Sequence, residues 1–294
     1  MKLLLAVSGG IDSMYMAERS LRGDLFPSCD FAVTHCNFRL RGEESDGDEA
    51  FVRQWCSKRG VLCFVRAFDT AGYASSRGIS IEMAARELRY TWFAELCVSE
   101  GFDAVVVAHN ADDNAETLLL NLLRGCGSRG LRGMAPDSGE LPRRVLRPLL
   151  SIPRAEIRAW MEAEGLSWRE DSTNTDTAFK RNKLRSMVIP VFAEINPSYL
   201  RTLAADMERF AQVDDIAEDY YQQALSECVL PDGAIDLKKV VTYKHWEYLL
   251  YRFTEGHLNA DGLLRLKKSV ASGRPLGGKI FGPYKVRKGK LRLI

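Results

Sequence analysis

Short apolar runs alternate with amphipathic stretches through the first half of the chain. The runs lie at residues 3–7, 30–34, 61–68 and 103–109. Runs of this length are typical of strands buried on both faces of a parallel sheet. Apolar residues at helical spacing follow each run, around residues 14–21, 44–60, 81–96 and 113–125. This alternation predicts an α/β fold with a doubly wound parallel sheet, in which ligands bind at the carboxyl ends of the strands.

The pattern changes after residue 125. Residues 126–148 are rich in Gly, Pro and Arg, so we expect a long mobile loop there. A helix is predicted over 151–165, and a polar turn, "EDSTN", over 170–174. Apolar positions up to Cys228 predict one long helix over about 205–228. We therefore predict two domains, an α/β domain over 1–204 and a smaller, mainly helical α+β domain over 205–294.

Composition narrows the class of protein. No apolar run reaches the roughly 18 residues that span a membrane, and the apolar start is too short for a secretory signal. The seven cysteines include no C-x-x-C pair, which argues against a disulfide framework, a zinc ribbon and a cysteine-held iron–sulfur cluster. We expect a cytoplasmic protein with no membrane partner.

The net charge of +2 conceals an uneven distribution. Residues 262–294 contain ten Lys or Arg and no Asp or Glu, which leaves 31 basic and 39 acidic residues, a net charge of −8, in the rest of the chain. Such asymmetry indicates a basic surface for nucleic acid or another polyanion. The alternative is a basic hairpin that is merely solvated.

A phosphate-binding motif, "SGGIDS", follows the first apolar run. Gly9 and Gly10 allow a sharp turn and a close approach to a ligand, and the helix start that follows offers N–H groups to phosphate. Asp12 would repel phosphate, so we predict that it binds a magnesium ion. The alternative is an ordinary strand–turn–helix corner. The Walker motif is absent, and a G-x-G-x-x-G string at 125–130 follows a helix rather than a strand.

A second group of polar residues, "AHNADDNAET", follows the fourth run. Asp113 and Glu116 lie three residues apart at a helix start and therefore share a face, with Asp112 and His109 nearby. Such carboxylates can hold magnesium or bind an ammonium group. The alternative is capping of the helix N-terminus, which accounts for one carboxylate more easily than for three.

These motifs together identify a resemblance. "SGGIDS" resembles the phosphate motif of the PP-loop family of ATP pyrophosphatases. "HCNFRLRGEES", "ARELRY", "AHNADDNAETLLLNLLRG", "RPLLSIPRAEI" and "EDSTN" with "RNKLRSMVIP" are similar to the tRNA(Ile)-lysidine synthetase family, in the family's order over about residues 2–195. The chain departs from many relatives at Phe38 and Arg39, where they have His and Gly. The family often carries a further C-terminal domain, and we expect this chain to lack it, either as a naturally short form or through truncation.

The resemblance implies a reaction and its partners. ATP adenylates the C2 oxygen of the wobble cytidine in an isoleucine tRNA with anticodon CAU, pyrophosphate leaves, and the ε-amine of free L-lysine displaces AMP to give lysidine. The implied cofactors are ATP and Mg²⁺. Domain 1–204 would bind ATP and catalyse the reaction, and domain 205–294 would bind tRNA. The oligomeric state stays open, with a homodimer among the arrangements considered.

The resemblance also implies roles for particular residues. ATP would be bound by Ser8, Gly9, Gly10, Ile11, Asp12, Ser13 and His109, with Asp12 also holding magnesium. Lysine binding and catalysis would fall to Asp113, Glu116 and Arg89, and Asp12 is also predicted to be catalytic. From the basic tail and the Arg-rich loop we predict tRNA contacts at Arg124, Arg129, Arg132, Lys285, Arg287 and Lys288.

Two other functions stay open. The first is a different PP-loop enzyme that modifies tRNA, such as a thiolase, although such enzymes usually need paired or cluster-binding cysteines. The second is a non-catalytic tRNA-binding protein with a relict nucleotide site, against which the intact Asp12, Asp113 and Glu116 argue.

Overall fold

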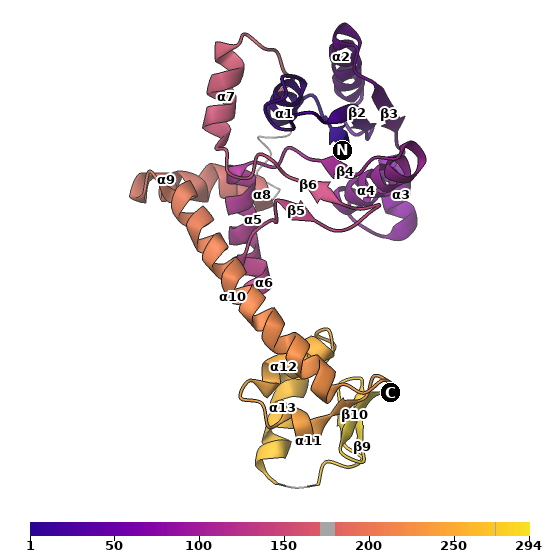
Figure 1. The fold of residues 1–294 in the computed structure, drawn as a ribbon, viewed down its shortest axis with the longest axis vertical. Helices are drawn as coiled ribbons and strands as arrows, with labels where there is room; N and C mark the ends of the chain where they lie inside the picture. Colours follow the sequence, from indigo (N-terminus) through magenta and orange to yellow (C-terminus); the bar gives the residue numbers. More distant parts are fainter. Residues whose placement is uncertain (171–179, 274) are drawn as a thin grey trace. The chain divides into compact units, whose positions relative to one another are not determined.

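The computed structural model describes residues 1–170, 180–273 and 275–294, which divide into two units, Met1–Phe210 and Ala211–Ile294 (Figure 1). Within the described residues, no helix is both long and apolar enough to cross a membrane.

Unit 1 contains a six-stranded sheet in the order β3-β2-β1-β4-β6-β5. All neighbouring pairs are parallel except the pair formed by β5 and β6. The strands are β1 (Lys2–Ala6), β2 (Asp30–Asn37), β3 (Cys63–Ala67), β4 (Ala104–Val106), β5 (Asp137–Ser138) and β6 (Val145–Leu146).

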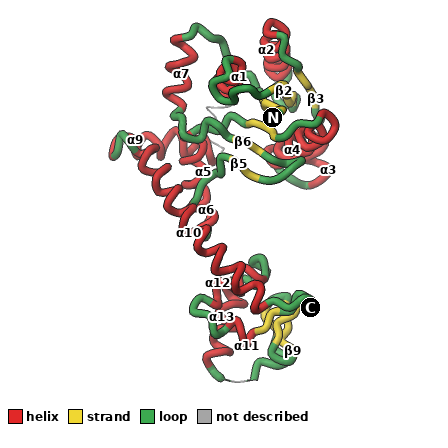
Figure 2. The backbone as a smooth tube through the Cα atoms, in the orientation of Figure 1, coloured by secondary structure: helices red, strands yellow, loops and turns green. Residues whose placement is uncertain are grey.

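Some of the helices lie between these strands in the chain, and the others follow the last strand (Figure 2). The helices are α1 (Ile11–Leu21), α2 (Glu43–Arg59), α3 (Thr70–Arg77), α4 (Ile81–Glu100), α5 (Ala111–Arg124), α6 (Ser128–Leu131), α7 (Arg154–Ala163), α8 (Lys180–Lys183), a π-helical turn (Leu184–Val188), α9 (Ile189–Ile195) and α10 (Tyr199–Cys228).

Alternating residues of β1 face two separate cores. Leu3 and Leu5 pack with residues of α1, α2 and α7, whereas Leu4 packs with α4 on the other face. All three leucines are fully buried. Helices therefore cover both faces of a mostly parallel sheet, and the prediction of a doubly wound α/β fold is confirmed.

The prediction of a long mobile loop over 126–148 is wrong, because this segment forms α6, β5 and β6. Val145 of β6 pairs in parallel with Val105 of β4 and is almost fully buried. Strands of two residues are too short to produce a recognisable alternation of apolar and polar positions. The predicted turn over 170–174 lies, apart from Glu170, outside the described residues.

Unit 2 combines helices with a four-stranded antiparallel sheet in the order β7-β10-β9-β8. Its elements after α10 are β7 (Ile235–Asp236), α11 (Leu237–Val240), α12 (Trp246–Phe253), α13 (Ala260–Ala271), β8 (Ile280–Phe281), β9 (Tyr284–Arg287) and β10 (Lys290–Leu293). This is the mainly helical α+β arrangement predicted for the second domain. The long helix expected from about residue 205 begins at Tyr199 and runs across the boundary between the units.

Candidate active site

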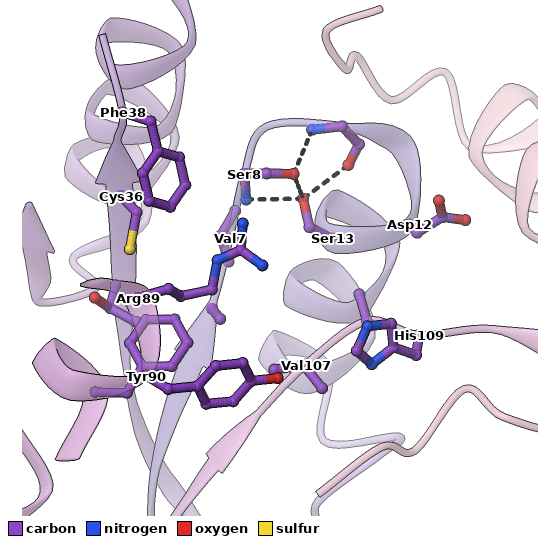
Figure 3. A pocket seen from close by; sticks show the side chains of 15 residues that line it. Val7, Ser8, Asp12, Ser13, Cys36, Phe38, Arg89, Tyr90, Val107 and His109 are labelled. Carbon is purple, nitrogen blue, oxygen red and sulfur yellow. Dashed lines mark hydrogen bonds between the residues drawn. The ribbon is translucent and has the colours of Figure 1, made fainter. Parts of the chain in front are cut away.

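The loop between β1 and α1 is tied together by the side chain of Ser13. Its hydroxyl oxygen accepts hydrogen bonds from the N–H groups of Ser8 and Gly9, each at 3.2 Å. It also donates to the carbonyl of Gly10 at 2.8 Å, and Figure 3 shows the bonds to Ser8 and Gly10. Gly9 has φ +97°, which favours glycine. Ser13 is only 6% exposed, whereas Ser8 is exposed. Ser13 therefore fixes the shape of the loop, and the Ser8 hydroxyl is accessible to a ligand.

Asp12 joins this loop to α5. Its Oδ1 accepts a hydrogen bond from Nδ2 of Asn110 at 2.9 Å, and its Oδ2 lies 3.9 Å from Nε of Arg154. Burial raises the pKa of Asp12, and Arg154 and Asn110 oppose that shift. The carboxyl ends of β1 and β4 are thus linked by one hydrogen bond between side chains.

The surroundings of Asp12 fit a magnesium ion that is held mainly by phosphate oxygens. No group of three or more His, Cys, Asp or Glu side chains that could hold a metal occurs in the described part of the chain. Magnesium at nucleotide sites is commonly bound by one or two carboxylates together with substrate phosphates and water. A single carboxylate beside a helix start that offers N–H groups to phosphate matches that mode of binding.

Asn110 caps α5 through a reciprocal pair of hydrogen bonds. Its Oδ1 accepts from the N–H of Asp113 at 3.0 Å, and its own N–H donates to Oδ2 of Asp113 at 3.2 Å. Asp112 has a different partner, because its Oδ2 accepts from the N–H of Arg154 at the start of α7. Capping of α5 therefore accounts for one oxygen of Asp113, which is the single carboxylate that the alternative interpretation explained, whereas Asp112 binds the start of α7.

Glu116 is 1% exposed and lies between two arginines. Nε of Arg185 donates to Oε1 at 2.7 Å, and Nε of Arg181 forms an ion pair with Oε2 at 3.0 Å. Arg185 also approaches Oδ1 of Asp113 at 3.4 Å. Burial raises the pKa of Glu116, and Arg185 opposes that shift. The predicted lysine-binding carboxylates thus already have cationic partners.

Sequence reasoning missed Arg181 and Arg185 as site residues. Both lie in "RNKLR", which we used only as a family motif. Their spacing of four residues places them on one face of the short helical segment. Nothing in a single sequence shows that this segment returns to α5 some 70 residues away.

A pocket of about 300 Å³ opens beside the phosphate loop. Its lining includes Ser8, Gly10, Asp12, Ser13, Arg89 and His109, and Figure 3 shows Arg89 reaching from α4 toward the loop. The structure therefore brings most of the predicted ATP-binding residues together with Arg89. Asp113 and Glu116 are not part of this lining and lie on α5, beyond Asn110.

His109 follows β4 and is largely buried. Burial lowers its pKa to about 4, with Asp113 opposing the shift and nearby arginines adding to it. The ring is therefore neutral at physiological pH. Its Nδ1 is buried and has no hydrogen-bond partner among the described residues. A neutral ring with an unused nitrogen can hydrogen-bond a bound ligand without adding charge.

The two residues that depart from the family pattern have distinct structural effects. Phe38 lines the pocket, stacks on Phe68 at a centroid distance of 5.7 Å and lies 5.1 Å from the guanidinium carbon of Arg89. Arg39 has φ +53°, a conformation that favours glycine. Phe38 thus helps to place Arg89, whereas Arg39 occupies a strained backbone position.

The residues predicted to bind tRNA lie in both units. Arg124 and Arg129 are exposed in α5 and α6, and Arg132 directly follows α6. In unit 2, the β9–β10 hairpin carries Lys285, Arg287 and Lys288, of which the last two are exposed.

The fold provides acidic partners for part of the basic tail. Arg265, Lys267 and Arg292 form ion pairs with Asp261, Glu247 and Asp232, respectively. All three carboxylates lie outside residues 262–294, so counting charges within the tail overestimated its basic character.

Comparisons with known proteins agree with this geometry. The family profile described as "PP-loop domain" matches residues 1–192. The chain is 41% identical over 249 residues to a tRNA(Ile)-lysidine synthase of Parabacteroides distasonis, covering 85% of this chain and 55% of that protein. It is 40% identical over 235 residues to a tRNA(Ile)-lysidine synthase of Chlorobaculum tepidum, covering 80% of this chain and 69% of that protein.

The chain belongs to the PP-loop family and, within it, to the tRNA(Ile)-lysidine synthases. The resemblance predicted from the motifs is thus confirmed. Membership of the PP-loop family implies that unit 1 uses ATP. The chain spans little more than half the length of the first of these relatives.

A solved structure shows the same fold. The U34-tRNA thiolase NcsA from Methanococcus maripaludis, with its [4Fe-4S] cluster, matches with a TM-score of 0.59 at 18% identity, over 72% of this chain and 73% of that one. At this identity the likeness concerns the fold of the PP-loop family only.

Proposed function

We propose that this chain converts the wobble cytidine of a CAU-anticodon isoleucine tRNA into lysidine, using ATP and free lysine. The observation that carries the proposal is the hydrogen bond between Asp12 and Asn110. It places the phosphate loop next to the carboxylates of α5, as a reaction that couples ATP to an amine requires. The names of the curated relatives support the same activity.

The first step transfers AMP to the cytidine. The C2 carbonyl oxygen attacks the α-phosphorus of ATP, the new O–P bond forms, and the bond to the β-phosphate breaks so that pyrophosphate leaves. The Ser8 hydroxyl and the N–H groups at the start of α1 hold the departing phosphates. Arg89 offsets negative charge in the pocket, and neutral His109 orients the nucleotide through Nδ1. Magnesium bound by Asp12 would offset further phosphate charge.

The second step replaces the C2 oxygen with lysine. The ε-amine attacks C2, the C2–O bond breaks, and AMP leaves with that oxygen. A free lysine amine has a pKa of about 10.4 and must lose a proton before it attacks. Asp113 and Glu116 bind the ammonium group and one of them accepts the proton. Binding at Glu116 requires Arg181 or Arg185 to release one carboxylate oxygen.

The tRNA is held through its phosphates. Arg124, Arg129 and Arg132 of unit 1 contact the RNA backbone, and the hairpin residues Lys285, Arg287 and Lys288 give unit 2 its role in tRNA binding. The pocket itself is poorly suited to thiolation, because burial raises the pKa of its Cys36 to about 12 and keeps the thiol protonated.

The proposal is tested by incubating the full chain with ATP, Mg²⁺, radiolabelled lysine and a tRNA transcript with anticodon CAU. A transcript that differs only in carrying GAU is the matched control. We expect label in the CAU transcript alone, and only when ATP is present. RNA-dependent turnover of ATP without incorporation of lysine would instead indicate another PP-loop reaction. Binding of RNA without turnover would indicate a non-catalytic protein.

A further inference from the structure

A groove of about 740 Å³ lies beside the pocket in unit 1. Four arginines from separate elements line it: Arg66 of β3, Arg77 of α3, Arg86 of α4 and Arg143 between β5 and β6. We call it the arginine groove. None of its arginines belongs to the site described above.

Three of these arginines lie on aromatic rings. The guanidinium carbon of Arg66 is 5.8 Å from the ring centre of Trp92, that of Arg77 is 4.9 Å from Tyr73, and that of Arg86 is 4.9 Å from Tyr90. Planar cations and aromatic rings both stack on nucleobases, and each such base contact is tolerant of sequence.

The arginine groove carries a net positive charge. Its two glutamates, Glu87 and Glu95, pair with Arg77 and Arg66. Arg86 and Arg143 are exposed, and no ion pair involves either of them within the described ranges. Two unneutralised guanidinium groups are therefore accessible to anions in solution.

Helix α4 connects the groove to the pocket. Tyr90 lines both, and its neighbour Arg89 points into the pocket while Arg86 lies in the groove. An RNA strand that presents one nucleotide at the mouth of the pocket, next to bound ATP, would therefore have its adjacent nucleotides within reach of the groove.

We propose that the arginine groove binds the nucleotides that flank the modified base in a single-stranded RNA loop. Arg86 and Arg143 contact phosphates, and the Arg–Tyr pairs stack on unpaired bases. This assignment rests on the proposed function, and it adds an RNA site in unit 1 to the contacts predicted for the Arg-rich loop and the basic hairpin.

The test is binding of an RNA hairpin with a CAU-containing loop to the full chain, over a range of salt concentrations. We expect the double variant Arg86→Glu/Arg143→Glu to bind at least tenfold more weakly. The slope of log affinity against log salt should fall by roughly 1.4, about 0.7 for each lost single-strand contact. The affinity for ATP should stay within twofold of the parent.

The matched control is Arg53→Glu/Arg158→Glu, which makes the same charge change on α2 and α7, helices that pack on the other face of the sheet. An equal loss of binding in the control would attribute the effect to net charge and overturn the proposal. The proposal would also be overturned if the groove variant bound RNA with the same affinity and the same salt slope as the parent. Thermal unfolding of both variants checks that they are folded. If the glutamate variant is unfolded, Arg86→Ala/Arg143→Ala replaces it, with an expected loss of RNA affinity of about threefold to fivefold.

The outcome separates this inference from the proposed function. If the parent incorporates no lysine but the groove variant loses RNA binding, the groove assignment holds and the lysidine assignment fails. If the parent forms lysidine and the groove variant binds RNA as the parent does, only the groove assignment fails.

Discussion

Nε of Arg185 lies 2.7 Å from Oε1 of Glu116, a carboxylate that is almost completely buried on α5. The arginine is contributed by a segment far away in sequence and also approaches Asp113. A lysine ammonium that binds these carboxylates must therefore compete with a cation that the protein itself supplies.

This competition leads to a prediction about the choice of amine. Glu116→Gln and Asp113→Asn should each raise the KM for lysine at least tenfold, because each removes a charge that holds the ammonium group. ATP affinity should change little, since neither residue lines the nucleotide pocket. The measurement is lysine-dependent incorporation of label at saturating ATP. An equal loss of ATP affinity in both variants would make these carboxylates part of the metal site instead.

Asp12 is predicted to be needed for chemistry and not for folding. Its side chain is 25% exposed, and Asp12→Asn can still accept the hydrogen bond from Asn110. We expect pyrophosphate release and lysine incorporation to fall by far more than tenfold, while the unfolding temperature stays close to that of the parent. Retention of more than about a tenth of the activity, a barrier change under about 1.4 kcal/mol, would contradict the magnesium role.

The buried ring of His109 should make stability depend on pH. Because burial lowers its folded pKa to about 4, from an ordinary value of 6.5, the unfolded chain binds a proton there between these values while the folded chain does not. The free energy of unfolding should therefore fall as pH drops from 6.5 to 4. In His109→Gln this fall should be smaller by about 1–3 kcal/mol. Urea unfolding of both proteins at pH 7 and pH 4.5 measures the difference, and an identical fall would show that the ring is not held neutral.

The basic hairpin should bind RNA phosphates rather than read bases. Replacing Lys285, Arg287, Lys288 and Lys290 with Gln should weaken tRNA binding and reduce the salt slope by roughly 0.7–0.9 for each lost contact. The control replaces three other cations of the tail with Gln, Arg265, Lys267 and Arg292, which already have acidic partners, and should change binding less for each charge removed. If the hairpin variant binds tRNA as tightly as the parent at every salt concentration, the hairpin is only solvated.

The parts of the fold that were predictable from sequence are those with a strong local signal. The buried runs at β1 to β4 and the glycine turn before Asp12 needed only periodicity and steric reasoning. The strands within 126–148 could not be predicted in this way, because β6 forms through its pairing with β4 and has no apolar pattern of its own.

The site was predictable only in part for a similar reason. Residues that follow a strand end, such as Ser8 and His109, can be located from the order of strands. The partners of the three carboxylates were not predictable. Asp113 pairs with Asn110, Asp112 with Arg154 and Glu116 with Arg185, and the last two contacts form only when segments distant in sequence meet.

The fate of one oxygen atom tests the central claim most directly. A CAU transcript with ¹⁸O at the C2 carbonyl of the wobble cytidine is incubated with the full chain, ATP and lysine, and the AMP is analysed by mass spectrometry. Adenylation followed by attack of lysine at C2 predicts one ¹⁸O in AMP for each lysine incorporated. Formation of lysidine with unlabelled AMP would contradict the account, because the C2 oxygen would then have left without passing through an adenylate.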